Sequence, residues 1–118
     1  MAVPDDMDTV QKFLDEYRAC CGNDPLIKRT GKNREFRENY PLSLEEIVDI
    51  LRNQLTVDHC YQGPEKEDDQ NRNLPGAVCK FKYPWESILI FIKLKVPEDV
   101  NLRRERTICL SFHEVGMF

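Results

Sequence analysis

The chain has 118 residues, of which 41% are hydrophobic and 32% are charged. This balance is normal for a globular protein, and the length favours a single domain over residues 1–118. No apolar run approaches the roughly 20 residues that a membrane span needs, and the acidic segment 1–8 lacks the apolar stretch of a signal peptide. We therefore expect a cytoplasmic protein that does not bind a membrane.

The five cysteines do not form a recognisable set of paired spacings, and the chain has no C-x-x-C motif. An odd number in this arrangement argues against a disulfide framework and against a closed zinc site. The adjacent His59 and Cys60 are a possible fragment of a metal site, although buried thiols are the simpler interpretation. We expect no metal and no other cofactor.

The net charge is −4, which argues against binding DNA or other nucleic acid non-specifically. Acids and bases are nevertheless segregated along the chain. Residues 42–75 carry eight acids and three bases, whereas residues 76–118 carry seven bases and five acids. A cationic surface can therefore coexist with a negative total.

Two helices are predicted in the first half of the chain. The first covers about residues 8–21, where apolar side chains recur at helical spacing and Gly22 follows. The second covers about residues 44–55. It begins with a capping-box pattern at Ser43 and Glu46, and its apolar stripe consists of Leu44, Ile47, Ile50, Leu51 and Leu55.

The segments that flank the second helix are polar. Residues 26–27 are a possible short edge strand, and the basic stretch after them is either a solvated loop with a helical turn near Phe36 or a loop that contacts phosphate. A turn is expected between Thr56 and Tyr61. Residues 62–75 are expected to form an exposed loop, in which the carboxylates at 67–69 are either solvated or bind a cation.

Beyond Gly76 the hydrophobic period changes to two. Residues 76–83, 88–96 and 106–113 are rich in β-branched and aromatic residues and predict an antiparallel meander, with a polar loop at 97–105. The fold class is therefore α+β, with the two N-terminal helices packed on one face of the C-terminal antiparallel sheet.

Alternation of side chains assigns the two faces of this sheet. The aliphatic face, which includes Ile90, Ile92, Leu94, Ile108, Leu110 and Phe112, is expected to pack on the helices. The opposite face then collects Lys80, Lys82, Phe91, Lys93, Lys95, Ser111 and His113. Ammonium groups beside an aromatic ring suit single-stranded RNA, because they contact phosphates while the ring stacks a base. Solubility and protection of a sheet edge are the alternative explanation of the lysines.

From Leu55 to Glu114 the chain resembles the MqsR-type mRNA interferase toxins of the RelE-like ribonuclease superfamily. The matching segments are residues 55–58 (LTVD), 61–64 (YQGP), 74–76 (LPG), 91–95 (FIKLK) and 111–114 (SFHE). The resemblance implies a RelE-like fold and a metal-independent endoribonuclease that cleaves mRNA and is neutralised by a cognate antitoxin protein.

The residue roles that follow from this interpretation divide into two groups. The catalytic candidates are His113, Lys93, Lys80 and Gln62. The RNA-binding candidates are Lys82, Lys95, Phe91, Tyr61, Arg34 and Arg37. The family usually has lysine at the position of Gln62 and tyrosine at that of Phe91, so these two residues depart from its pattern. Two other functions stay open: a non-catalytic module that binds RNA or protein, and a metal or redox role for Cys60, His59 and Cys79.

Overall fold

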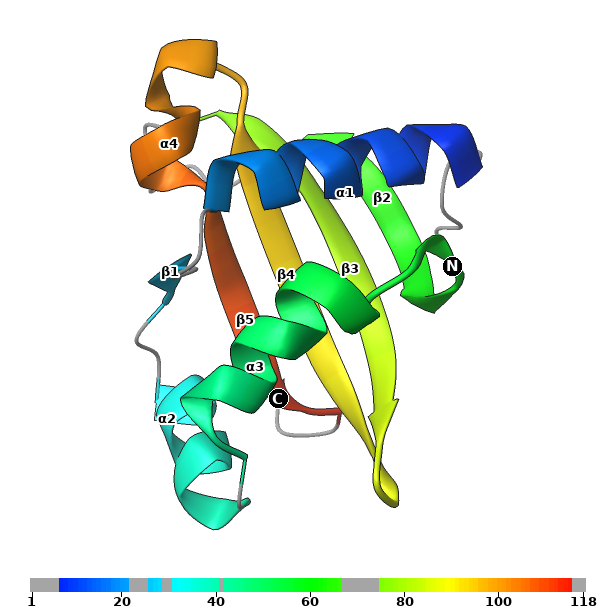
Figure 1. The fold of residues 1–118 in the computed structure, drawn as a ribbon, viewed down its shortest axis with the longest axis vertical. Coiled ribbons are helices and arrows are strands. Elements are labelled where there is room, and N and C mark those ends of the chain that lie inside the picture. Colours follow the sequence, from blue (N-terminus) through cyan, green and yellow to red (C-terminus); the bar gives the residue numbers. More distant parts are fainter. Residues whose placement is uncertain (1–6, 22–25, 29–30, 41, 67–74, 116–118) are drawn as a thin grey trace.

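A computed structural model describes residues 7–21, 26–28, 31–40, 42–66 and 75–115 of the chain (Figure 1). The strands are β1 Leu26–Ile27, β2 Cys60–Lys66, β3 Gly76–Trp85, β4 Ile88–Pro97 and β5 Ile108–Glu114. They form one sheet in the order β1-β5-β4-β3-β2. β2 to β5 are antiparallel, and the short β1 adds to the outer edge of β5 in parallel. The predicted α+β class is confirmed.

Two helical segments cross the same face of the sheet, as Figure 1 shows. They are α1 Met7–Cys21 and α3 Leu44–Asp49, and α3 continues into the π-helical turn η1 Ile50–Gln54. The apolar stripes of both segments are buried against the sheet in one core cluster. Leu44 is an exception to the predicted stripe because it is 55% exposed at the first residue of α3, one turn before the core contacts begin.

Arg18 joins the two helical segments directly. Its guanidinium donates hydrogen bonds to the carbonyl oxygens of Leu51 and Leu55, at 3.4 and 2.5 Å. These are carbonyls at the end of a helix, which have no partner within the helix itself. Arg18 therefore replaces a helix cap at the end of η1 and fixes α3 and η1 against α1.

The predicted turn and loop after Thr56 are wrong in part. The 3₁₀ turn η2 Val57–His59 leads directly into β2, which pairs with β3. Gly63, Pro64 and the charged residues of β2 disfavour a central strand, but they are tolerated at an edge and beside irregular pairing, which β2 has at two places. The remainder of the predicted loop, with its carboxylates at 67–69, lies outside the described residues.

Two other polar segments are more helical than predicted. α2 Gly31–Asn39 is a helix rather than a loop with one turn, because Asn33 and Phe36 both lie on its buried side. The predicted loop at 97–105 contains η3 Val100–Leu102, followed by the short helix α4 Arg103–Arg106. In both segments, charged side chains on the solvated side obscure the helical pattern.

β5 contains an irregularity that changes which side chains point toward the helices. Lys93 pairs with Ser111, but the next residue, Leu94, pairs with Cys109, so β5 has one extra residue at this point. A bulge of this kind reverses the alternation of the residues before it. Cys109 is therefore in the core beneath the helices and Ile108 is beside Lys95, opposite to the predicted assignment.

In the part of the chain that the structure describes, no helix is both long and apolar enough to cross a membrane.

Candidate nucleic-acid interface

The face of the sheet opposite α1 and α3 carries the predicted cationic group. The register pairs Lys80 with Lys93 and Lys82 with Phe91 across β3 and β4. It also pairs Lys93 with Ser111 and Phe91 with His113 across β4 and β5. We call this surface the lysine face and define it by Tyr61, Gln62, Glu65, Lys80, Lys82, Phe91, Lys93, Lys95, Ser111 and His113. The residues that alternation assigned to this face on β3, β4 and β5 therefore lie together in the structure.

β2 adds two side chains to this face that simple alternation would separate. Cys60 pairs with Phe81 and belongs to the core, whereas Gln62 pairs with Lys80. The irregular pairing between Cys60 and Gln62 places both Tyr61 and Gln62 on the lysine face. Tyr61 and Gln62, which both belong to a segment that matches the resembled family, therefore lie beside the lysines.

The aromatic side chains form a row across the strands. The ring centroids of Tyr61 and Phe91 are 6.4 Å apart, and those of Phe91 and His113 are 5.4 Å apart. Lys82 Nζ lies 4.6 Å from the centroid of the Tyr61 ring, which is cation–π distance. Lys82 is exposed, so its ammonium group and the ring beneath it are presented together.

A hydrogen-bonded carboxylate lies at the β2 side of the lysine face. Gln62 Nε2 donates to both carboxylate oxygens of Glu65, at 2.8 and 2.9 Å, and Lys80 Nζ is 3.5 Å from Glu65 Oε1. The hydrogen bond from Gln62 lowers the pKa of Glu65, and the charges of Lys80 and Lys93 add to this effect against partial burial. Glu65 is therefore ionised and partly neutralises the cationic group.

Sequence reasoning did not identify Glu65. The residue lies in a run of polar and acidic side chains that reads as a loop, and its contact with Lys80 depends on the strand pairing of β2. A Gln and a Glu three residues apart are too common to signal this arrangement.

Three of the predicted site residues are less accessible than expected, because Phe91 is 8% exposed and two others are buried more deeply. Lys95 is 2% exposed and His113 is 3% exposed. The stem of Lys95 lies across Gly76, where a Cβ atom would be only 3.0 Å from Lys95 Cε. His113 packs against Phe91, and its Nδ1 is 3.0 Å from the carbonyl oxygen of Glu114, so Nδ1 carries the proton and donates it.

The two predicted RNA-binding arginines lie apart from the β2 side of the lysine face. Arg34 and Arg37 are exposed on α2. This helix packs along β5, toward the edge of the sheet opposite to the β2 edge. Arg34 Nε is 4.0 Å from Glu38 Oε1 within the same helix. The structure therefore does not join these arginines to Tyr61, Gln62 or Lys82.

The groups that suggested a metal or redox role have other contacts. His59 Nδ1 accepts a hydrogen bond from the backbone N–H of Thr56 at 3.0 Å, while Cys60 and Cys79 are buried in the core. Among the described residues, no group of three or more His, Cys, Asp or Glu side chains is placed to hold a metal ion.

No known protein family, curated protein or solved structure matches this chain. The lysine face and its contacts are thus the observations from which a function can be inferred.

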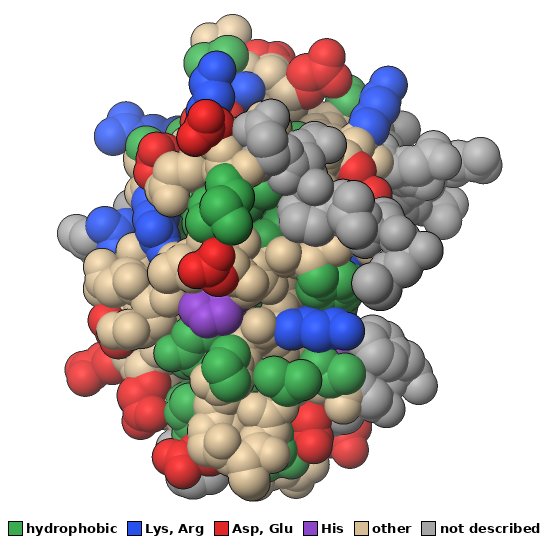
Figure 2. Space-filling view, turned by 90° about the vertical axis from the view of Figure 1, so that its right-hand side faces the viewer, with side chains coloured by type: hydrophobic (Ala, Val, Ile, Leu, Met, Phe, Trp, Pro, Cys, Tyr) green, Lys and Arg blue, Asp and Glu red, His purple; other side chains and the backbone are tan. Residues whose placement is uncertain are grey.

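Charges of both signs lie on the side of the molecule drawn in Figure 2. Among the described residues on that side, acidic and basic side chains are interspersed with hydrophobic ones. This mixture fits the net charge of −4. Attraction of a polyanion would therefore depend on the few lysines of the sheet rather than on the field of the whole protein.

Proposed function

We propose that the lysine face binds single-stranded RNA and that the protein is a metal-independent endoribonuclease toxin of a toxin–antitoxin system. The observation that carries this proposal is the cross-strand register, which groups three lysines with Tyr61 and Phe91 on one face. Lys80, Lys82 and Lys93 would bind phosphates, and the partly exposed ring of Tyr61, which lies beside the buried ring of Phe91, would stack a base.

The resemblance to MqsR-type toxins supports the same function and implies a RelE-like arrangement of the α+β fold. The natural substrate would then be mRNA, and the partner would be a cognate antitoxin protein. A protein of this class acts in the cytoplasm, where mRNA is translated.

Cleavage without a metal needs a base, an acid and cations around the phosphate. The ribose 2′-oxygen forms a bond to phosphorus as the bond from phosphorus to the 5′-oxygen breaks. The base takes the 2′-hydroxyl proton, and the acid gives a proton to the leaving 5′-oxygen. The products carry a 2′,3′-cyclic phosphate and a 5′-hydroxyl group.

The lysine face supplies candidates for the cations and for one of the two groups that transfer a proton. Lys80 and Lys93 pair across β3 and β4, so both ammonium groups can stabilise the charge on the phosphorane. Gln62 binds Glu65 through its amide and therefore acts as a positioning residue for Lys80. His113 is the candidate for proton transfer, which requires its buried ring to become accessible to the RNA.

A second candidate function is a non-catalytic RNA-binding module. The burial of His113 favours it, because an imidazole that is 3% exposed does not reach a bound ribose in this conformation. Both candidates use the same lysines and aromatic rings for binding, so they differ only in whether the RNA is cut.

The test is to measure RNA binding and cleavage with the same protein samples. Anisotropy of a labelled single-stranded RNA gives the Kd at several salt concentrations, and a gel of the RNA at excess protein detects cleavage. Lys82→Ala should weaken binding and reduce the salt slope of log Kd by about 1, because one phosphate contact is lost. The matched control is Lys12→Ala, since Lys12 is exposed on α1 across the sheet.

The toxin function would be supported if the wild type cleaves RNA, if Lys80→Ala loses this cleavage, and if expression of the wild type arrests growth. Binding without cleavage would establish the second candidate in its place. If the wild type does not bind RNA, or if Lys12→Ala weakens binding as much as Lys82→Ala, the lysine face has no role in RNA recognition.

A further inference from the structure

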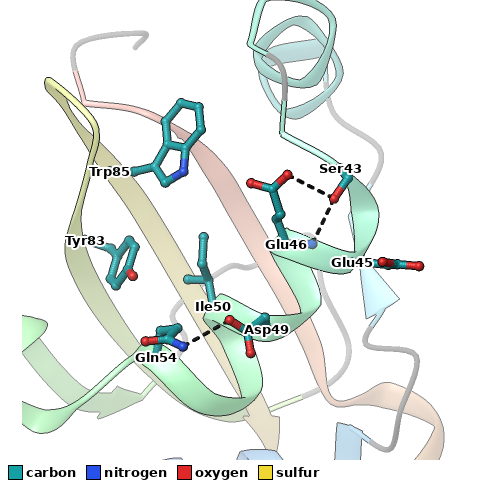
Figure 3. A pocket seen from close by; sticks show the side chains of 8 residues that line it. All are labelled: Ser43, Glu45, Glu46, Asp49, Ile50, Gln54, Tyr83 and Trp85. Atoms are coloured by element: carbon teal, nitrogen blue, oxygen red, sulfur yellow. Dashed lines mark hydrogen bonds between the residues drawn. The ribbon is translucent and has the colours of Figure 1, made fainter.

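A concave site lies on the helix side of the sheet, away from the lysine face. It has a volume of about 440 Å³ and is lined by Ser43, Glu45, Glu46, Asp49, Ile50, Gln54, Tyr83 and Trp85. Figure 3 shows Tyr83 and Trp85 on β3 across this hollow from Glu46 and Asp49, whereas the side chain of Glu45 extends away from the two rings. Tyr83 and Trp85 alternate with Lys82 and Pro84 along β3, so they point to the opposite side of the sheet from Lys82. We call this site the acidic hollow.

The aromatic wall of the acidic hollow is held in place by neighbouring rings. Trp85 packs edge-on against Tyr40, with centroids 6.2 Å apart and planes at 83°. Tyr83 packs against His59, with centroids 5.1 Å apart and planes at 68°. Tyr83 and Trp85 are both only partly buried, so each ring keeps some surface for a ligand.

The opposite wall is negatively charged. Asp49 accepts hydrogen bonds from Asn53 Nδ2 and Gln54 Nε2, at 2.9 and 3.0 Å, and these bonds lower its pKa. Glu46 Oε1 accepts a hydrogen bond from Ser43 Oγ. Glu45 is exposed beside them at the start of α3. Among the described residues that line the hollow there is no lysine or arginine to neutralise these carboxylates.

We propose that the acidic hollow binds an arginine side chain from a basic peptide segment of a partner protein. A guanidinium group stacks on an aromatic ring and also donates a pair of hydrogen bonds to a carboxylate, and here the two kinds of group face each other. Lysine supplies the charge but has neither the planar group that stacks nor the paired N–H donors that match a carboxylate. Binding at this site is independent of the proposed function, because the lysine face is on the other side of the sheet.

The surface next to the hollow favours a peptide over a small cation. Leu44, which lies between Ser43 and Glu45 of the hollow in the chain, is 55% exposed at the start of α3. An apolar residue beside the arginine would gain contact with it, whereas a free amino acid or ion would not. The acidic lining and this apolar contact together describe a basic segment with an apolar neighbour.

Trp85 provides a direct measurement, because it is the only tryptophan in the chain. Its fluorescence would be followed as the full chain is titrated with three short peptides of the form acetyl-Gly-Leu-X-Gly-amide, in which X is arginine, lysine or citrulline. Citrulline keeps the size and shape of arginine but has no charge. We expect saturable binding in the order arginine, lysine, citrulline, with citrulline weaker than arginine by about tenfold or more.

The matched variants separate the charge of the hollow from the charge of the protein. Glu45→Gln/Glu46→Gln removes two carboxylates, and the glutamine at 46 keeps the capping-box residue type. This double substitution should raise the Kd of the arginine peptide by about tenfold or more. Glu35→Gln/Glu98→Gln removes the same charge at exposed positions outside the hollow and should bind like the wild type.

Any of the following results would overturn the proposal: equal binding of the arginine and citrulline peptides, unchanged affinity in Glu45→Gln/Glu46→Gln, or no saturable change in fluorescence. Free arginine that binds as tightly as the peptide would also overturn it and would identify a small-molecule site. Lys82→Ala should retain full affinity for the peptide, so failure of RNA binding and failure of peptide binding are distinguishable.

Discussion

Gly63 occupies a backbone conformation that other residues rarely adopt. Its φ is +108°, and a Cβ atom there would lie 2.5 Å from the carbonyl oxygen of Val78 on β3. Both the torsion and the contact involve backbone atoms, so a side chain cannot be accommodated by a change of rotamer. The glycine therefore permits the second irregularity of β2, between Gln62 and Glu65, which follows the one that places Tyr61 and Gln62 on the lysine face.

We predict that Gly63→Ala lowers the free energy of unfolding by about 1–3 kcal/mol, as expected for a strained backbone position. Urea unfolding followed by circular dichroism measures this change. Gly31→Ala is the control, because nothing lies within 4 Å of its Cβ position at the start of α2. It should be neutral or stabilise by up to about 1 kcal/mol. Equal effects of the two substitutions would contradict this account of β2.

At the scale of elements, the entry into β2 depends on a histidine. His59 accepts a hydrogen bond from Thr56 N–H and occupies the position that glutamate or glutamine takes in a capping box. Burial lowers the pKa of His59 from its ordinary value of 6.5, and Asp58 opposes this shift. The folded chain therefore binds fewer protons than the unfolded chain just below pH 6.5. The contribution of His59 to the free energy of unfolding is complete above about pH 6.5 and is lost as the pH falls through the lowered pKa.

We predict that His59→Gln reduces the loss of stability on acidification from about pH 7 to pH 5. Glutamine keeps the acceptor for Thr56 N–H but does not titrate. Urea midpoints at several pH values would measure the difference from the wild type. Asp58→Asn should extend the loss to lower pH, because the carboxylate that raises the histidine pKa is gone. Parallel curves for wild type and His59→Gln would show that this cap does not sense pH.

One buried side chain of α2, that of Asn33, hydrogen-bonds the helix to β5. Asn33 Oδ1 accepts a hydrogen bond from Phe112 N–H at 2.9 Å, and its Nδ2 donates to the carbonyl oxygens of Leu110 and Lys28, at 3.2 and 2.8 Å. These contacts satisfy backbone groups at the outer edge of β5 beyond the reach of the short β1. Asn33 thus completes the edge of the sheet where no further strand is described.

We predict that Asn33→Ala destabilises the protein by about 1–3 kcal/mol or more, since buried backbone groups lose their partners. The same loss should expose part of the β5 edge and increase aggregation, measured by light scattering near the unfolding temperature. Asn39→Ala, at an exposed position of the same helix, should change neither property. A small effect of Asn33→Ala would mean that solvent replaces the amide at this edge.

Across the whole molecule, the sequence predicted the elements whose pattern is local. The spacing of Val10, Phe13 and Leu14 is enough for α1, and period two is enough for β3 and β4. Alternation also identified the lysines and Phe91 of the lysine face. The α+β class follows from these elements, while the RelE-like arrangement and the toxin function stay predictions.

What the sequence did not predict depends on pairing between distant segments. The bulge that brings Cys109 into the core is defined by the partner Leu94, and β2 is a strand because β3 offers it an edge. The burial of Lys95 likewise depends on Gly76, which lies opposite Pro97 at the start of β3. Such features are set by tertiary contacts, so propensity and periodicity carry little information about them.

The position of β5 between β4 and β1 has a consequence during translation. The bond from Phe112 to Asn33 joins residues 79 apart in the chain. Until the ribosome has released β5, β1 has no neighbouring strand and Phe36 has no Phe112 to pack on. The N-terminal half of a nascent chain therefore emerges with apolar surface uncovered and cannot complete its core until synthesis reaches β5, which makes it a candidate client for chaperones at the exit tunnel.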